Sequence, residues 1–162
     1  MRSITIPTEL GARSKAATRC LLFTAGGRLF GCEIGVVREI IPIRRATRLP
    51  GAPGFVLGLI NLRGMVVTVI DLVRRFGGEA ADQVDGSIIV VDFGTRAAGL
   101  AVDAMRDVQG VISRAVDTGG SAAAGLPASI VKGMAESTEG LVILLDLAAV
   151  LRQVMSSAEG ES

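Results

Sequence analysis

The sequence predicts a mostly β protein organised as small barrels or a sandwich. Apolar residues make up 49% of the 162-residue chain and are mainly Val, Ile, Leu and Ala, with five Phe and no Trp or Tyr. Such side chains suit a pleated, half-buried surface. The 21 glycines are spread along the chain and suit frequent tight turns. About nine or ten short apolar runs recur at regular spacing, which is more than one small barrel uses and enough for two.

The first half of the chain predicts a β-hairpin followed by a helical turn. Residues 20–25 and 28–34 are apolar runs separated by Gly26 and Gly27, which is typical of a hairpin. In residues 36–41, Val36, Val37, Ile40 and Ile41 are spaced one and four apart, with Arg38 and Glu39 between them. This spacing predicts a short helix with the two charged residues on the opposite face, ended by Pro42.

A second hairpin is predicted over residues 55–61 and 65–70, around a turn at residues 62–64. Asp71 follows it and can cap a short helix running to Phe76. Two apolar hairpins with similar spacing do not establish a duplication, and no sequence repeat is clear enough to claim one.

The second half predicts five more strands, at residues 87–93, 97–103, 108–113, 130–135 and 141–145. Asp146 can cap a last helix that ends near Met155. Residues 115–128 are long and rich in Gly, Ala and Ser, which predicts a mobile loop. We expect one ordered domain over residues 19–155, between flexible segments at 1–18 and 156–162.

Composition excludes several classes of protein. The formal net charge is +1, so the whole molecule has no strong field to attract nucleic acid or an anionic membrane. The longest apolar runs are much shorter than the roughly 20 residues needed to cross a bilayer. The first 20 residues contain no apolar stretch typical of a secretion signal. We therefore expect a cytoplasmic protein without direct membrane insertion.

The chain contains no histidine, which is its strongest negative feature. This excludes Ser-His and Cys-His catalysis, a histidine phosphoacceptor and most zinc-hydrolase ligand sets. No phosphate-binding GxxxxGK[ST] segment occurs. The carboxylates fall mostly at predicted strand ends, where capping and turn formation are common roles; they are Asp71, Asp92, Asp103, Asp107 and Asp146. We expect no catalytic residue, no metal site and no cofactor, although an acid pair formed in three dimensions stays open.

Two further features allow alternative interpretations. Residues 38–48 hold Arg38, Arg44, Arg45 and Arg48 against the single acid Glu39, a pattern that fits a solvated loop, a protein partner or a nucleic-acid backbone. No aromatic residue lies between the arginines to stack bases, which disfavours nucleic acid. The only cysteines, Cys20 and Cys32, are expected to be buried hydrophobic side chains rather than a redox pair. They flank a turn, but whether they face each other is left open.

Arg63 is the candidate binding residue. It closely follows Asn61, the only asparagine of the chain, at the tip of an apolar hairpin. An arginine in that position either pairs with a carboxylate or anchors a partner, and arginine is enriched at interface hot spots. Turn chemistry alone equally allows Asn61 and Gly64 to form the turn with Arg63 simply solvated.

These residues resemble the CheW family of chemotaxis coupling proteins. Residues 50–64 read PGAPGFVLGLINLRG and residues 69–72 read VIDL, which is similar to the family signature. Residues 36–41 (VVREII) resemble the family's short helix, and residues 99–103 (GLAVD) resemble its second-half strand motif. The match extends through residues 130–133 (IVKG) and 141–147 (LVILLDL).

The resemblance implies two small SH3-like, five-stranded β-barrels packed around a shared hydrophobic interface, with neither barrel an enzyme. It implies a non-enzymatic adaptor between the cytoplasmic tip of methyl-accepting chemoreceptors and the regulatory domain of a CheA-type histidine kinase, and no nucleic acid is expected as a partner. The alternative function kept beside it is a small β-barrel nucleic-acid-binding protein that uses the arginine patch at residues 38–48. The residues assigned to partner binding are Glu39, Arg63, Val37, Gly58, Asn61, Leu62 and Gly64. Those assigned to the structural motif are Pro50, Pro53, Phe55, Asp71, Leu72, Gly99 and Gly133.

Two departures from the family pattern are visible. Thr68 replaces a proline that often precedes the VIDL motif, a change that a strand tolerates. The segment around residues 119–125 lacks the aromatic residue that some relatives carry there, at a loop associated with kinase contacts.

Overall fold

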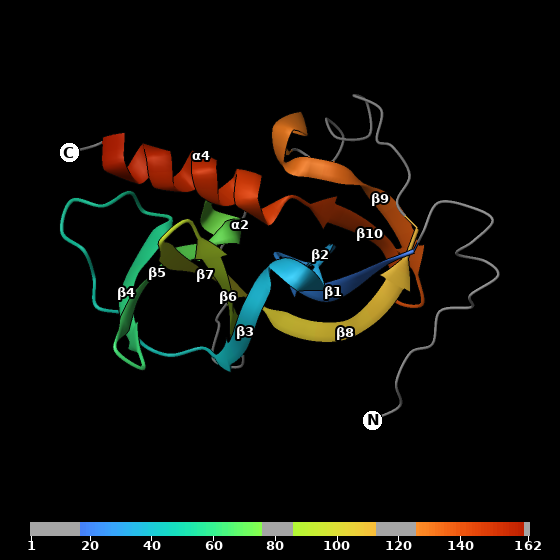
Figure 1. Cartoon of the computed structure of the whole chain (residues 1–162). Coiled ribbons are helices and arrows are strands. Elements are labelled where there is room, and N and C mark those ends of the chain that lie inside the picture. Colours follow the sequence, from blue (N-terminus) through green and yellow to red (C-terminus); the bar gives the residue numbers. More distant parts are fainter. Residues whose placement is uncertain (1–16, 76–85, 113–125, 161–162) are drawn as a thin grey trace.

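The computed structural model describes residues 17–75, 86–112 and 126–160, which form two five-stranded sheets and a long C-terminal helix (Figure 1). The first sheet has the strand order β8-β1-β2-β10-β9 and the second β3-β6-β7-β5-β4. The strands are β1 (Thr18–Ala25), β2 (Arg28–Glu33), β3 (Val37–Pro42), β4 (Val56–Leu62), β5 (Met65–Asp71), β6 (Ser87–Phe93), β7 (Arg96–Val102), β8 (Ala104–Val111), β9 (Val131–Ser137) and β10 (Gly140–Leu145). The helices are η1 (Ile34–Val36), α2 (Leu72–Arg75), η2 (Ala128–Ile130) and α4 (Leu147–Gly160).

The two sheets are built from two halves of the chain that exchange strands. The hairpin β1–β2 lies in the first sheet, but the chain then crosses to supply β3, β4 and β5 to the second. The hairpin β6–β7 lies in the second sheet, and the chain returns to supply β8, β9 and β10 to the first. Each sheet contains one parallel pair, β10 with β2 and β5 with β7. The fold is thus a structural repeat of five strands, β1–β5 and β6–β10, that the sequence did not reveal.

Equivalent positions of the two halves carry the same local structures. A side chain at Gly31 would lie 2.9 Å from a methyl of Val142, and one at Gly99 would lie 2.6 Å from a methyl of Ile88. Both glycines therefore allow neighbouring side chains to pack closely over the backbone. Helix α2 follows β5 and helix α4 follows β10 in the same way.

Both helices are capped by the aspartate that precedes them, as predicted. The Asp71 carboxylate accepts the N–H groups of Val73 and Arg74 at 3.0 and 3.2 Å. The Asp146 carboxylate accepts the N–H of Ala149 at 3.0 Å. These bonds satisfy donors that have no partner within a helix's first turn.

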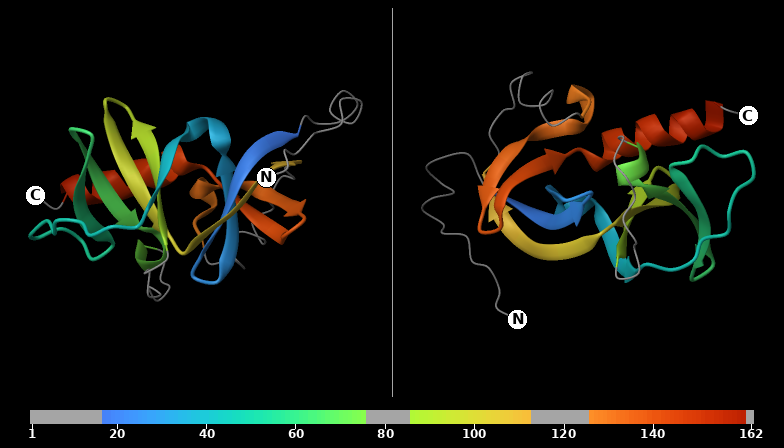
Figure 2. Two further views of the ribbon diagram at one scale, coloured as in Figure 1. Left: turned by 90° about the horizontal axis from the view of Figure 1, so that it is seen from below. Right: turned by 180° about the vertical axis from the view of Figure 1, so that it is seen from behind.

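The apolar side chains form three clusters. One is made by strands of the first sheet and one by strands of the second. The largest lies between the two sheets and includes one face of α4, formed by Leu147, Val150, Leu151 and Val154. This spacing is that of a helical stripe facing a core. In Figure 2, α4 leaves the first sheet and crosses to the second, so the core joins both sheets into one unit.

The expectation of two five-stranded units is confirmed, but each is an open sheet whose edge strands are linked by other means. In the second sheet, Thr47 exchanges two backbone hydrogen bonds of 2.8 Å with Leu59 and so extends the β4 edge toward β3. In the first sheet, the side chain of Gln109 on β8 bonds to Thr138, which follows β9. These links define the two open edges around which the candidate site is built.

The predicted helical turn over residues 36–41 is wrong, because this segment is η1 followed by β3. Strand β3 pairs with β6 through Val37 opposite Val91 and Glu39 opposite Val90, which leaves Arg38 as an extra, bulged residue. A bulge shifts the alternation of a strand by one residue. Val37 and Ile40 therefore share a face at a spacing of three, which imitates a helical pattern in the sequence.

Other boundaries differ less. Strand β8 begins at Ala104, earlier than the predicted residue 108, and α4 continues past Met155 to Gly160. The hairpins β1–β2 and β4–β5 and strand β6 lie where they were predicted. Phe76 and most of the predicted loop at 115–128 lie outside the described residues, while residues 128–130 form η2.

Candidate functional site

The turn between β4 and β5 holds Arg63 in an unusual conformation. Leu62 pairs with Met65, so Arg63 and Gly64 form a two-residue loop, and their φ angles are 52° and 86°. Positive φ at both positions is typical of a type I′ hairpin turn. The Asn61 side chain accepts the Gly64 N–H at 2.9 Å and braces the loop. Arginine in the left-handed region costs about 1 kcal/mol, and such strain concentrates at functional sites.

The guanidinium of Arg63 pairs with the carboxylate of Glu39 on β3. The pair spans the two edge strands of the second sheet, β4 and β3. The Arg63 side chain is 70% exposed and that of Glu39 25%. A pair this exposed stabilises the fold by at most about 1 kcal/mol. Its charges are therefore available to a partner.

Beside this pair lies a second one, formed by the bulged Arg38. Its guanidinium lies 2.8 Å from the Asp92 carboxylate and 3.4 Å from the Met65 sulfur. Because Arg38 is the extra residue of the bulge, consecutive residues Arg38 and Glu39 both reach charged partners at the same end of the sheet. The rim of the second sheet therefore carries two adjacent ion pairs.

Strand β8 repeats the bulge of β3. Met105 pairs with Phe23 and Asp107 with Leu22, which leaves Arg106 as the extra residue. In both strands the bulge turns two apolar side chains toward the space between the sheets, Val37 and Ile40 on β3 and Met105 and Val108 on β8. The sequences VREI and MRDV at residues 37–40 and 105–108 are thus structural equivalents.

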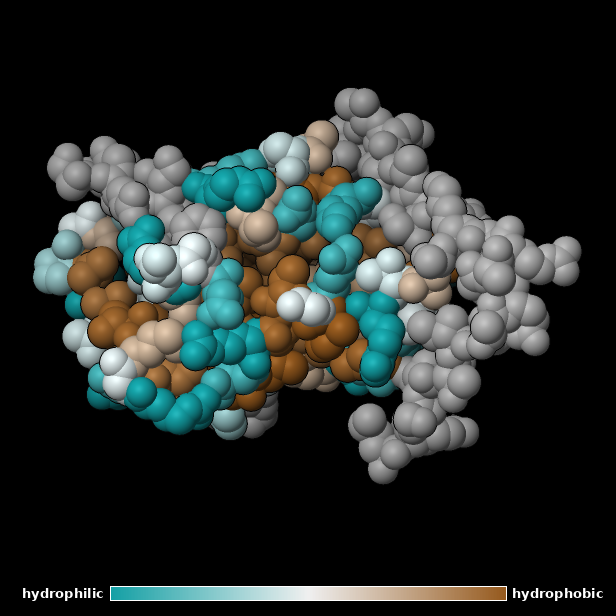
Figure 3. Space-filling view, in the orientation of Figure 1, coloured by the Kyte–Doolittle hydropathy of each residue, from teal (hydrophilic) through white to brown (hydrophobic). Residues whose placement is uncertain are grey.

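These side chains form an apolar surface where the two sheets meet, which we call the junction surface. It consists of Ile34, Val36, Val37, Ile40, Met105 and Val108. Val36 is 38% exposed and Ile40 40%, and the other four are half-buried against the main core. Figure 3 shows an apolar area at the middle of this face, over β3 and β8, with hydrophilic residues around it.

The residues assigned to partner binding from sequence divide into two groups. Arg63, Asn61 and Gly64 are exposed at the turn, and Val37 and Glu39 are half-buried on β3. Leu62 and Gly58 are buried. The β-carbon of any side chain at position 58 would lie 2.2 Å from the Thr47 carbonyl oxygen, which is too close for a non-bonded contact. These two residues can influence binding only by holding the hairpin in place.

The residues assigned to the structural motif lie in three places: before β4, at the start of α2 and within strands β7 and β9. The Pro53 carbonyl accepts the Val56 N–H at 3.0 Å, and the Phe55 carbonyl accepts the Asp71 N–H at 2.8 Å. Asp71 and Leu72 are buried at the start of α2. Pro50 is exposed, and Gly99 and Gly133 are buried within strands.

Sequence reasoning missed the contribution of β8. Met105 and Val108 form one side of the junction surface, yet neither was proposed as a binding residue. The available signal was the similarity of VREI to MRDV, together with the Asp-Leu pairs at 71–72 and 146–147. Each pair of motifs marks equivalent positions of the structural repeat.

The remaining charged candidates have local roles. Arg38 pairs with Asp92, and Arg44 donates to the Asn61 carbonyl at 2.8 Å, so the arginines at 38–48 do not act as one free patch. Asp103 accepts the Gly26 N–H at 2.8 Å. Within the described residues, no group of three or more acidic, Cys or His residues is placed to hold a metal ion. None of the helices in this part of the chain is long and apolar enough to cross a membrane.

Cys20 and Cys32 are both buried and unbonded to each other. Cys20 pairs with Glu33 and Cys32 with Leu21, so their side chains lie on opposite faces of the β1–β2 hairpin. Burial raises the pKa of the Cys20 thiol to about 11 and that of Cys32 to about 12. Both are therefore neutral at physiological pH and poorly nucleophilic.

The raised pKa values of the two cysteine thiols predict that the folded protein loses stability in alkaline solution. Their pKa values are raised above the ordinary value of 9.0, so their stabilising effect is complete below pH 9 and is lost between about pH 9 and 12. The pKa of Lys132 is also raised, chiefly by its hydrogen bond to Glu33, and its deprotonation acts in the same direction. We expect the free energy of unfolding to fall by about 3–4 kcal/mol from pH 8.5 to 10.5, with each thiol contributing about half. Urea titrations at each pH measure the free energy of unfolding. The double variant Cys20→Ala/Cys32→Ala should show a much smaller fall with pH. If the wild type and the variant lose the same free energy, the two thiols are not the cause.

Comparison with known proteins identifies the family. The CheW-like domain model matches residues 19–155. The chain belongs to the CheW family. It is 35% identical over 131 residues to the chemotaxis protein CheW of Rhizobium meliloti, covering 80% of this chain and 84% of the relative. It is 30% identical over 132 residues to CheW of Klebsiella aerogenes, covering 81% and 80%.

A solved CheW structure has the same fold. The crystal structure of the scaffolding protein TtCheW from Thermoanaerobacter tengcongensis superimposes with a TM-score of 0.68 at 30% identity, over 80% of this chain and 89% of that one. As a CheW-family member, the chain is a scaffold protein of chemotaxis-type signalling. Neither the comparisons nor the arginines at 38–48 support the nucleic-acid alternative.

Proposed function

We propose that this CheW-family chain couples the cytoplasmic tip of methyl-accepting chemoreceptors to the regulatory domain of a CheA-type histidine kinase. The observation that carries the proposal is the Arg63–Glu39 ion pair, because Glu39 lies on β3 between Val37 and Ile40, two residues of the apolar junction surface. A surface with an apolar centre and a charged rim is typical of a protein interface.

The junction surface suits a helical partner. A helix presents apolar side chains at spacings of three and four residues, and such a face can lie along the strip formed by β3 and β8. Arg63, held away from the sheet by its turn, would then pair with an acidic side chain of the partner. Arginine at the edge of a desolvated apolar contact is a common hot spot. On this proposal, the receptor tip presents such a helix to the junction surface.

The action of such an adaptor is allosteric rather than chemical. Binding energy spent on one conformation of the kinase shifts its equilibrium between active and inactive states. The carboxylates of the described residues support a role without catalysis, because Asp71 and Asp146 cap helices and Asp92 pairs with Arg38. We place the protein in the cytoplasm, held at receptor arrays through its partners.

The proposal predicts two separate binding activities. The purified chain should bind a soluble fragment of the receptor tip and an isolated kinase regulatory domain, both from the same genome, with dissociation constants of about 10 μM or lower. Isothermal titration calorimetry measures both. The variant Arg152→Gln, on the exposed side of α4, is a control that should leave receptor binding unchanged. If neither partner binds the wild-type chain, the coupling role is wrong.

A further inference from the structure

Strand β8 provides half of the junction surface although it is an edge strand. Among the strands of the described residues, its backbone pairs only with β1, through a ladder that the bulge at Arg106 interrupts. Met105 and Val108 point to the junction surface, while Asp107 and Gln109 lie on the opposite face of the strand. Side chains on the two faces of a strand share one backbone, so a change in its twist moves both sets. Contacts that fix Asp107 and Gln109 therefore also fix the orientation of Met105 and Val108.

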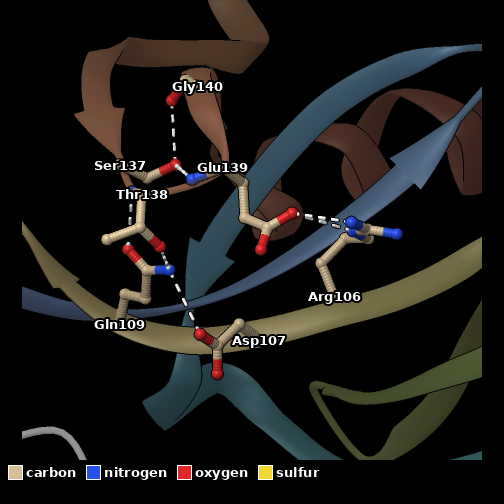
Figure 4. Close-up of polar contacts among 7 residues, drawn as sticks. All are labelled: Arg106, Asp107, Gln109, Ser137, Thr138, Glu139 and Gly140. Atoms are coloured by element: carbon tan, nitrogen blue, oxygen red, sulfur yellow. Dashed lines mark hydrogen bonds and ion pairs between the residues drawn. The ribbon is translucent and has the colours of Figure 1, made fainter.

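Gln109 holds β8 from its unpaired side. Its side-chain oxygen accepts the backbone N–H of Thr138 at 3.2 Å, and its nitrogen donates to the Thr138 hydroxyl. The same nitrogen donates to the Asp107 carboxylate at 3.1 Å. Figure 4 shows the amide of Gln109 directed at Thr138, between β8 and the β9–β10 turn. The side-chain amide of Gln109 thus links the two edge strands of the first sheet, β8 and β9, which share no backbone ladder.

The turn that receives Gln109 is itself fixed by side chains. The Ser137 hydroxyl donates to the Gly140 carbonyl at 2.8 Å and accepts the Glu139 N–H at 3.0 Å. Glu139 in turn pairs with the bulged Arg106 at 2.7 Å. Arg106 and Gln109 therefore tie β8 to one rigid turn at two points (Figure 4).

The burial of Gln109 distinguishes it from a surface contact. It is 5% exposed, and among the described residues only Gln109 and Asp71 are buried polar side chains. Asp71 is explained as a helix cap. The structural repeat places Gln109 at the position of Ile41 in β3, so an apolar residue would fit the fold. A buried amide that forms three hydrogen bonds, two of them to Thr138, indicates a specific requirement for this link.

We propose that Gln109 is a positioning residue for partner binding: its amide locks β8 to the β9–β10 turn and so orients Met105 and Val108 in the junction surface. The inference rests on the proposed function, because the partner is the receptor tip. Gln109 itself lies on the face of β8 that is turned away from the junction surface.

The test compares Gln109→Leu with Thr138→Val in the full chain. Both should accelerate amide hydrogen exchange in β8 of the free protein, and Gln109→Leu should weaken binding of the receptor-tip fragment about tenfold, as expected if the competent arrangement of β8 falls to about a tenth. The double variant should bind no more than about twofold more weakly than Gln109→Leu, because the second change removes a bond already lost. Thr138 is exposed, so we expect Thr138→Val to fold normally. It therefore tests the same link even if Gln109→Leu does not fold.

Val142→Ala is the matched control. It removes buried methyl groups from β10 of the same sheet and leaves the hydrogen-bonding groups of Gln109 and Thr138 unchanged, so it should lower stability and leave receptor binding within about twofold. The inference is overturned if Gln109→Leu and Thr138→Val leave β8 exchange and binding unchanged, or if Val142→Ala weakens binding as strongly as they do. If the wild-type chain does not bind the receptor tip, the proposed function fails, and unaltered β8 exchange would separately overturn the lock.

Discussion

Gly58→Ala should lower the stability of the chain by about 3 kcal/mol, since it combines backbone strain with the loss of hydrogen bonds. Gly58 has a φ of 142°, and its β-carbon would lie 2.2 Å from the Thr47 oxygen. The segment that carries Thr47 must move away, which breaks the two bonds between Thr47 and Leu59. For a domain of this size we expect the melting temperature to fall by about 10 °C.

Gly35→Ala is the control for this change. Gly35 lies in η1 next to the junction surface, and within the described part of the chain no atom beyond its own neighbours along the helix lies within 4 Å of the position its β-carbon would take. Differential scanning calorimetry should show a melting temperature within about 2 °C of the wild-type value, as for most surface substitutions. If Gly58→Ala melts as the wild type does, the close approach of residue 47 to β4 is not part of the folded structure.

Arg63→Asn should weaken receptor binding by about 30-fold while the fold stays as stable as the wild type. The loss corresponds to about 2 kcal/mol, which is typical of a hot-spot arginine. Asn tolerates the left-handed conformation that Arg63 adopts, and Asn-Gly is a preferred type I′ sequence. Relief of the turn strain should offset the loss of the exposed pair with Glu39. Binding and stability would therefore change independently.

Titration calorimetry with the receptor tip and urea unfolding measure the two effects. Arg152→Gln, on the exposed side of α4, is a control for the removal of one exposed positive charge away from the rim of the second sheet. It should leave receptor binding within about threefold at roughly 0.15 M salt, where distant charges are screened. An equal loss for both variants would indicate a general charge effect, and full binding by Arg63→Asn would remove Arg63 from the interface.

Most strands of the fold could be predicted because the sequence patterns that mark them lie within short, continuous segments. The β1–β2 hairpin follows from Gly26-Gly27 between apolar runs, and the caps at Asp71 and Asp146 follow from an aspartate before an apolar helix. The pairing of Arg63 with Glu39 was implied only by family resemblance, since 24 residues separate the two. The structure shows the contact, and its role in binding stays a prediction.

What could not be predicted depends on pairing between distant strands. The bulge at Arg38 arises only when β3 pairs with β6, and it made a strand imitate a helix in the sequence. The exchange of strands between the two halves likewise leaves no local signal. The opposite orientation of Cys20 and Cys32 required the register of β1 with β2. The contribution of β8 to the junction surface was missed because the short similarity of VREI to MRDV marks equivalent positions only once the strand exchange is known.

The coupling role is tested most directly by sedimentation velocity of three purified proteins: the receptor-tip fragment, the kinase regulatory domain and this chain. We predict one complex that contains all three, and no complex of the receptor tip with the kinase domain when this chain is omitted or replaced by Arg63→Asn at micromolar concentration. Competition between the two partners for a single surface, with only binary complexes formed, would contradict a coupling function.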